Sequence, residues 1–100
     1  MPFVTAEDGV RIRYALAGLD SGPPLLLHHG VYSELGFWRQ ARRSQRSYVA
    51  SLEGRFRLIL LDARGHGESD QPTRLEAYDF RTRVLDVVAV LDAAGVESAH

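Results

Sequence analysis

The sequence has 100 residues, 45% of them hydrophobic, and a formal net charge of −1. This length allows a single domain, and the balanced charge argues against a general affinity for nucleic acid or an anionic membrane. Because cysteine is absent, a disulfide framework, a thiolate nucleophile and a cysteine-based metal site are excluded.

The N-terminal residues contain neither a basic segment nor an apolar run, so we do not expect a signal peptide. No apolar run approaches the ~20 residues that span a bilayer. A soluble, cytoplasmic protein without membrane or nucleic-acid partners is the expectation.

Residues 3–7 and 10–16 flank Asp8-Gly9, a pair that suits a two-residue hairpin turn of type I′. Apolar and polar residues alternate in the second segment. This period of two predicts a half-buried antiparallel strand with Arg11 and Arg13 in water.

Residues 25–28 follow a Gly-Pro-Pro loop and contain three consecutive leucines. Such a run predicts a short strand buried on both faces, as in a parallel sheet. We expect Gly30 to turn the chain off the strand end with backbone torsions closed to other residues. Ligands bind at the carboxyl ends of parallel strands, so His29, Gly30 and Val31 form a candidate functional loop.

Apolar residues recur at helical spacing from about Phe37 to Leu52, and Gly54 stands where a C′ glycine is expected. Several arginines fall mostly on the opposite face of this predicted helix. No aromatic residues interleave with them to stack bases, so a solvated face is favoured over a nucleic-acid site.

Residues 56–61 predict a second buried strand, which Asp62 closes before a loop rich in glycine. A last helix is predicted from the N-cap Asp79 to Ala94, with Gly95 as its stop. The apolar stripe of this helix is predicted to comprise Phe80, Val84, Val87, Val88 and Leu91. The residues predicted to point away are Arg81, Arg83, Asp86 and Asp92.

The order of hairpin, strand, helix, strand and helix indicates an α/β fold. The strand–helix–strand unit should form a right-handed parallel crossover. Antiparallel strands would then lie at one edge of a sheet whose interior strands are parallel. Residues 96–100 are expected to approach a further strand.

With this order, the chain resembles the N-terminal part of the α/β-hydrolase family from about Val4 onward. The resemblance depends on the hairpin, on the His-Gly pair at 29–30 and on the run Asp-x-Arg-Gly-His-Gly-x-Ser at 62–69. It implies that residues 1–100 form an incomplete α/β-hydrolase domain, truncated before the nucleophile elbow.

The resemblance also implies roles for the two loops. The backbone N–H of Val31 would be one oxyanion-hole donor, with Gly30 as the turn that presents it. Residues 62–69 would be mainly structural, with Ser69 tying down the turn. His66 could titrate near neutral pH, but a structural role is favoured because it has no visible carboxylate partner.

The nucleophile, acid and base of the family lie outside this sequence, because no Gly-x-Ser-x-Gly occurs. The implied complete enzyme cleaves an ester, lactone or similar bond of a small molecule by a nucleophile–His–acid mechanism, without a cofactor. The chain alone should be inactive. Epoxide hydrolases usually carry Pro where this chain has Tyr32, which argues against that branch.

Other chemistries fit less well. Gly65-His66-Gly67 continues to Asp70, so the dinucleotide-binding fingerprint fails. The sharpest rival is a metal site built on His28, His29, His66 and Asp62. It is disfavoured because adjacent strand residues point to opposite faces.

Two non-enzymatic interpretations stay open. In the first, the chain is a binding or interaction fragment that pairs through an open sheet edge, because the family's next strand is missing beside residues 25–28. The isolated chain would then be marginally stable or would self-associate. In the second, the sequence is a degenerate gene fragment without a function of its own.

Overall fold

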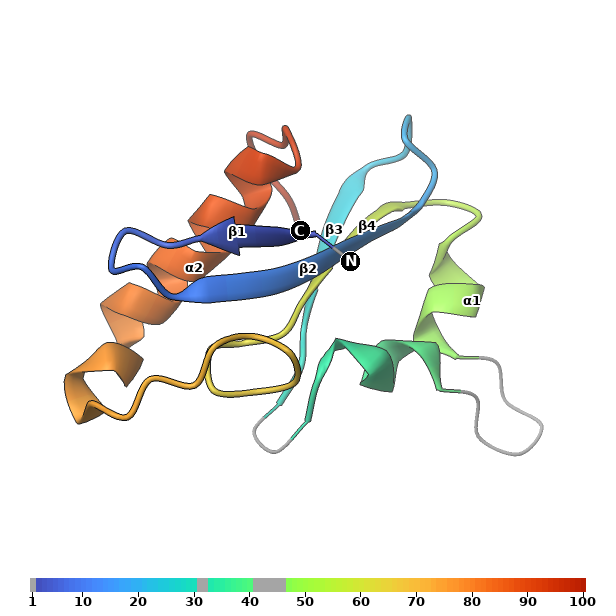
Figure 1. Cartoon of the computed structure of the whole chain (residues 1–100). Coiled ribbons are helices and arrows are strands. Elements are labelled where there is room, and N and C mark those ends of the chain that lie inside the picture. The colour runs from blue at the N-terminus through green and yellow to red at the C-terminus, as the bar shows by residue number, and fades with distance from the viewer. Residues whose placement is uncertain (1, 31–32, 41–46) are drawn as a thin grey trace.

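A computed structural model of the chain describes residues 2–30, 33–40 and 47–100. Its four strands are β1 (Phe3–Thr5), β2 (Arg11–Gly18), β3 (Pro24–His28) and β4 (Arg57–Leu61). The α-helices are α1 (Tyr48–Leu52) and α2 (Phe80–Ala93), and the 3₁₀-helices are η1 (Leu35–Arg39) and η2 (Leu75–Tyr78) (Figure 1).

The four strands form one mixed sheet in the order β1-β2-β4-β3. β1 pairs with β2 and β2 with β4 in antiparallel fashion, whereas β3 and β4 are parallel, with His28 opposite Leu61. The α/β architecture with antiparallel strands at one edge is therefore confirmed. The two interior strands of the described sheet, β2 and β4, are antiparallel rather than parallel, and the parallel pair lies at the other edge.

β4 lies inside the sheet and is covered on both faces, as the apolar run of residues 58–61 predicts. One face packs against α2, and the other packs against η1 and α1 (Figure 1). The buried residues of the first cluster are Ile12, Ile59, Leu61, Val90, Ala94 and Val96. Those of the second are Ala15, Leu35, Val49, Leu58 and Leu60.

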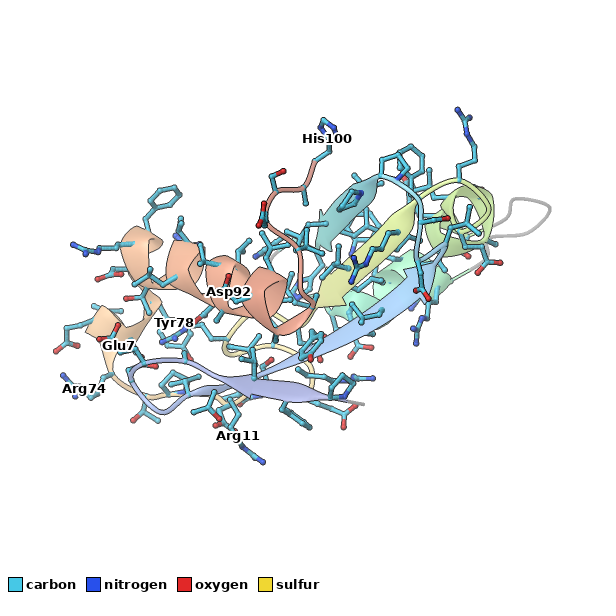
Figure 2. The ribbon with its side chains drawn as sticks, turned by 90° about the horizontal axis from the view of Figure 1, so that it is seen from above. Glu7, Arg11, Arg74, Tyr78, Asp92 and His100 are labelled. Atoms are coloured by element: carbon cyan, nitrogen blue, oxygen red, sulfur yellow. The ribbon has the colours of Figure 1, made fainter. Side chains whose placement is uncertain are left out.

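β3 ends the sheet, and its leucines are only half-buried, so the prediction of a strand buried on both faces is wrong. Part of its outer edge is nevertheless paired with His100, the last labelled residue in Figure 2. The Leu26 N–H donates to His100 O at 2.7 Å, and the His100 N–H donates to Pro24 O at 3.1 Å. This is the alternating pattern of a parallel ladder. Residues 96–100 thus approach the sheet as predicted.

The hairpin loop holds three residues rather than two. The Ala6 N–H donates to Val10 O, and the Gly9 N–H donates to Ala6 O, which encloses residues 7–9. Such a loop needs one residue in the left-handed region, and Gly9 supplies it with φ 86°. The type I′ prediction is therefore wrong.

Arg13 does not point into water as predicted. Its side chain is 13% exposed, and its Nη1 lies 2.6 Å from Glu68 Oε2 and 3.3 Å from Asp62 Oδ2. Arg11 does lie in water, 59% exposed, beside Asp70. The difference arises because the loop after β4 folds over this part of β2 and brings two carboxylates to Arg13.

The single helix predicted from Phe37 to Leu52 is also wrong. η1 ends at Arg39, Gln40 is extended, and α1 begins only after Ser47, whose Oγ accepts the Ala50 N–H. Residues 41–46 lie outside the described part of the chain. Two short elements, η1 and α1, place Leu35 and Val49 in the second core cluster. Gly54 has no positive φ, so the predicted C′ glycine is absent.

Both ends of α2 lie where the sequence predicts them. The Asp79 carboxylate accepts the Thr82 N–H at 2.7 Å, and Gly95 closes the helix with φ 73°. The predicted face is partly wrong, however, because Asp86 is buried whereas Phe80, Val84 and Val88 are exposed. Val87 and Leu91 pack against the core as predicted, and Val90 and Ala94, which the prediction left out, are buried beside them.

In the described part of the chain, neither α-helix has the length and apolar character needed to cross a membrane.

Candidate active site

The carboxyl ends of β3 and β4 lie side by side because the strands are parallel and in register. The loops that follow them border a cavity of about 260 Å³. Its lining residues are His28, His29, Gly30, Ala63, Arg64, His66, Tyr78 and Arg83. The structure thus brings the two loops that the sequence singled out to one cavity.

Gly30 lies in the wall of this cavity, whereas Val31, the expected oxyanion donor, lies outside the described residues. Gly30 has no positive φ, and a Cβ added to it would meet no other atom within 4 Å. The prediction that its torsions are closed to other residues is therefore wrong as far as φ is concerned. Hydrogen bonds from the two histidine rings hold this turn instead.

His28 and His29 line the same cavity, and their ring centroids lie 5.6 Å apart. The premise that they point to opposite faces is therefore wrong, because β3 ends at His28 and His29 already belongs to the loop. The Nδ1 atom of His28 lies 2.8 Å from His29 O, and that of His29 lies 2.7 Å from Gly30 O.

His29 is buried, and both of its ring nitrogens are engaged. Its Nε2 accepts the Ala63 N–H at 3.0 Å, so its Nδ1 must carry the proton that Gly30 O accepts. Burial lowers the pKa of the His29 imidazole, and the Gly30 carbonyl opposes this effect only in part. The ring is therefore a neutral link between the loops after β3 and β4.

Asp62, fully buried at the end of β4, organises the second loop. Its Oδ1 accepts the Leu35 N–H at 2.8 Å, and its Oδ2 accepts the Glu68 N–H at 2.9 Å. Arg13 compensates its charge from β2. One carboxylate therefore ties η1, the loop and the sheet together.

Gly65 and Gly67 in this loop occupy positions that only glycine can adopt without strain. Gly65 has φ 81°, and a Cβ there would overlap the Tyr78 ring. Gly67 has φ 51°, and a Cβ there would collide with the Asp62 carboxylate. Both positive φ and close approach therefore require glycine.

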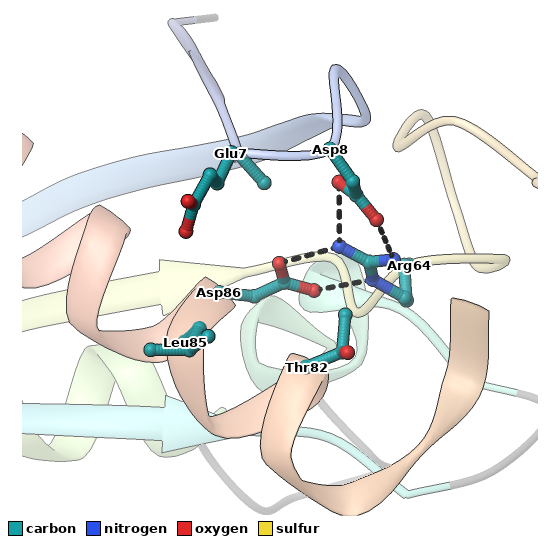
Figure 3. A pocket seen from close by; sticks show the side chains of 7 residues that line it. Glu7, Asp8, Arg64, Thr82, Leu85 and Asp86 are labelled. Atoms are coloured by element: carbon teal, nitrogen blue, oxygen red, sulfur yellow. Dashed lines mark hydrogen bonds and ion pairs between the residues drawn. The ribbon is translucent and has the colours of Figure 1, made fainter. Parts of the chain in front are cut away.

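The Arg64 side chain is 0% exposed, and its five N–H donors are all used. Figure 3 shows the bonds to Asp8 and Asp86. Asp86 accepts from Nε at 2.7 Å and Nη2 at 2.8 Å, and Asp8 accepts from Nη1 and Nη2. Ala77 O accepts the remaining donor. Hydrogen bonds to Asp86 raise the pKa of Arg64, and the guanidinium lowers the pKa of Asp8.

Arg64 and Asp86 also line a second cavity of about 210 Å³, which lies between the hairpin loop and α2 (Figure 3). Because the guanidinium has no donor to spare, this cavity offers no site for an anion. The Arg64 network connects the loop after β4 to the hairpin loop and to α2. This agrees with the mainly structural role predicted for the loop.

Ser69 ties down the turn as predicted. Its Oγ donates to Asp62 O at 2.6 Å and accepts the Arg13 N–H at 2.8 Å. His66 packs its ring 5.2 Å from that of His29, and its Nδ1 donates to Arg64 O at 3.1 Å. These contacts fit the structural role that we favoured for His66.

Sequence reasoning missed Asp86 and Asp8 as partners of Arg64. A charged residue at position 86, within a mostly apolar helix, was the signal available for the first of them. Among residues 2–30, 33–40 and 47–100, no group of three or more His, Asp or Glu side chains is placed to hold a metal ion.

Residues 23–100 match the family model of the alpha/beta hydrolase fold. The chain therefore belongs to the α/β-hydrolase family, as the two loop motifs and the mixed sheet indicated.

Relatives and solved structures agree with this assignment. The chain is 35% identical over 89 residues to epoxide hydrolase 4 of Mus musculus, covering 89% of this chain and 23% of that protein. It is 27% identical to 3-oxoadipate enol-lactonase 1 of Acinetobacter baylyi, covering 97% of this chain and 33% of the enzyme. A crystal structure of a hydrolase from Pseudomonas aeruginosa PA01 superposes with a TM-score of 0.86 at 31% identity, over 99% of this chain and 34% of that one. The chain thus spans a quarter to a third of these proteins.

Proposed function

We propose that this chain is part of a hydrolase that cleaves an ester, lactone or similar bond of a small molecule by a nucleophile–His–acid mechanism. Its described residues supply the scaffold, and the backbone N–H of Val31 serves as one oxyanion-hole donor. The observation that carries the proposal is the meeting of His29 and Gly30 with the loop after β4, at the carboxyl ends of two parallel strands.

The charges around the cavity support this chemistry. No aspartate or glutamate is among the described residues that line it, whereas three histidines, a tyrosine and two arginines are. A negative charge that develops on a substrate oxygen would therefore meet no carboxylate in the wall. A backbone N–H aimed at that oxygen contributes ~3 kcal/mol to transition-state stabilisation.

The names of the two relatives given above suggest two classes of substrate bond for this chain, an epoxide and an ester or lactone. One relative is named an epoxide hydrolase and another an enol-lactonase. In both cases a C–O bond is broken, and an oxygen takes up negative charge. Tyr32, in place of the proline usual in epoxide hydrolases, is our reason to put esters and lactones first, with epoxides as the competing class.

The test begins with the open reading frame that contains this chain. A Gly-x-Ser-x-Gly elbow, or one with Asp or Cys at its centre, should follow within about ten residues of His100. The encoded protein is then assayed with p-nitrophenyl acetate, a lactone and an epoxide. An authentic stop codon directly after His100 would instead favour the interaction fragment, which pairs through the outer edge of β3.

The donor is tested with a matched pair of variants. Val31→Pro removes the N–H, whereas Val31→Ala keeps it. We expect Val31→Pro to lower kcat by about 10²–10³-fold and Val31→Ala to stay close to the parent enzyme. Equal activity of the two variants would refute the oxyanion role. The isolated chain should not turn over any of the three substrates.

A further inference from the structure

The outer side of α2, which faces away from the sheet, carries one continuous stripe of exposed residues. They follow one another at intervals of four, three and four positions, which is the spacing of a seam between two packed helices. The stripe consists of Arg81, Leu85, Val88 and Asp92. Its two central residues are apolar, and each is 44% exposed. Single exposed apolar residues are ordinary, but adjacent ones indicate a surface that binds a partner.

The two charges at the ends of this stripe are unfavourable within their own helix. Arg81 lies in the first turn, where the helix dipole favours a negative charge, and Asp92 lies in the last turn, where it favours a positive one. In the described part of the chain, neither side chain forms an ion pair. Arg81 favours the charged form of Asp79, but that carboxylate is bonded to the Thr82 N–H.

A second copy of α2, laid antiparallel on this face, matches the stripe. A two-fold axis between residues 86 and 87 puts Arg81 of one copy opposite Asp92 of the other. The same axis puts Leu85 opposite Val88. Both pairs thus satisfy the symmetry that an isologous interface requires. Parallel helices would instead set like charges against each other.

We propose that the outer face of α2 is a docking surface for a second copy of this chain, bound in antiparallel orientation. The contact consists of the apolar residues Leu85 and Val88 and of two Arg81–Asp92 pairs related by symmetry. In the dimer each charge also lies at the end of the other helix that favours its sign. A partner of different sequence would need the reverse order of charges, whereas a second copy supplies it by symmetry.

The dimer should be weak, because the contact covers only about three turns of one helix. The exposed side chains of Phe80 and Val84 lie beside the stripe and can extend the apolar contact. The proposal is independent of the proposed function, since none of the four stripe residues is among the described residues that line the candidate active-site cavity.

The test measures the self-association of the chain by sedimentation velocity at low ionic strength, over a range of concentrations. Arg81→Glu sets two carboxylates against each other in each symmetric pair, and Asp92→Arg sets two guanidinium groups against each other. Each single variant should raise the dissociation constant of the dimer by about tenfold. The double variant R81E/D92R exchanges the charges and should restore the affinity of the parent. An equimolar mixture of the two single variants should dimerise as well.

Arg55→Glu is the matched control. It makes the same change of net charge at an exposed arginine that follows α1, on the opposite face of the sheet. The affinity should then stay close to that of the parent. The reversals in α2 should not unfold the chain, because each gives a helix end the sign of charge that its dipole favours. Circular dichroism and the urea midpoints of the variants check this.

The proposal is overturned if the parent chain remains monomeric at millimolar concentration, or if it forms species larger than a dimer, since a closed two-fold contact stops at two copies. It is also overturned if the double variant associates as weakly as the single ones. Association that all these substitutions leave unchanged would assign the contact to the outer edge of β3 and would refute the docking role of α2.

Discussion

The backbone of Gly67 packs directly against the carboxylate of Asp62, so that no space is left for a Cβ. The carboxylate has nowhere to move, because the N–H groups of Leu35 and Glu68 hold its two oxygens. The motif that follows β4 therefore depends on a close approach between its first residue and one of its glycines.

Gly67→Ala should destabilise the fold more than Gly9→Ala. Both glycines have positive φ, which costs an alanine about 1–2 kcal/mol, but only Gly67 faces an atom in the way. Overpacking should add about 1–3 kcal/mol. Urea denaturation of the two variants measures the difference, and equal losses would show that Asp62 yields without cost.

Breaking the Arg64–Asp86 pair should be costly. Asp86→Asn leaves a buried guanidinium without one of its counter-ions, and such a change destabilises proteins by about 3–5 kcal/mol. Glu76→Gln, which neutralises the exposed partner of Arg74, is the matched control and should have little effect. Similar midpoints of chemical unfolding for both variants would contradict a structural role of the buried pair.

Stability should fall on acidification because of His29. Its pKa is lower in the folded chain than in the unfolded one, so the unfolded state binds more protons as the pH falls. The contribution of the neutral ring is complete above about pH 6.5 and is lost as the pH falls through the folded pKa.

His29→Gln removes this titration while keeping a group that can accept from Ala63. The free energy of unfolding, measured in urea between pH 7.5 and pH 5, should therefore depend less steeply on pH in the variant. The slopes of the unfolding free energy against pH in the parent and in the variant can differ by at most about 1.4 kcal/mol per pH unit. An identical slope in both proteins would assign the acid sensitivity to other groups.

The isolated chain should self-associate, through either of two surfaces. One is the outer edge of β3, and the other is the exposed apolar face of α2, where Phe80 is 75% exposed. Sedimentation velocity at increasing concentration detects the association. Pairing through β3 should slow amide exchange at His28, whereas docking through α2 should be abolished by Val84→Glu and leave His28 unchanged.

A cooperative thermal transition of a strictly monomeric chain would contradict this expectation. Val84 is exposed, so its substitution should leave the stability of the monomer nearly unchanged.

Elements that depend on local signals were predictable from sequence. β4 follows from its unbroken apolar run, and α2 follows from its N-cap Asp79 and its stop at Gly95. The loop at residues 29–31 followed from the rule that ligands bind at the carboxyl ends of parallel strands. The resemblance added the loop at residues 62–69 in a mainly structural role, and the meeting of the two loops at one cavity was not predicted.

The face of α2 was not predictable in the same way. One side of the predicted stripe, with Phe80, Val84 and Val88, is exposed. The other side, with Val87 and Leu91, packs against the core together with Val90 and Ala94. Periodicity alone does not decide between them. The choice is made by Asp86, which must face inward to reach Arg64. That partnership joins residues 22 positions apart and has no local signature.

The same long-range character explains the other errors. The alternation of β2 predicted that Arg13 faces water, but the loop after β4 covers it and pairs it with Asp62 and Glu68. The spacing between β3 and β4 predicted one helix, but the region forms two elements, of which η1 contacts β3 and α1 contacts β2.

The Arg64 network also has a consequence for the order of folding. It unites Asp8, near one end of the chain, with Asp86, near the other. Loop-closure entropy delays contacts of such separation, so the network should form only after the transition state. Substitutions there should accelerate unfolding and leave the refolding rate almost unaltered, as low φ-values would record. The buried arginine would then act as a latch on the finished structure, governing how long the native state persists.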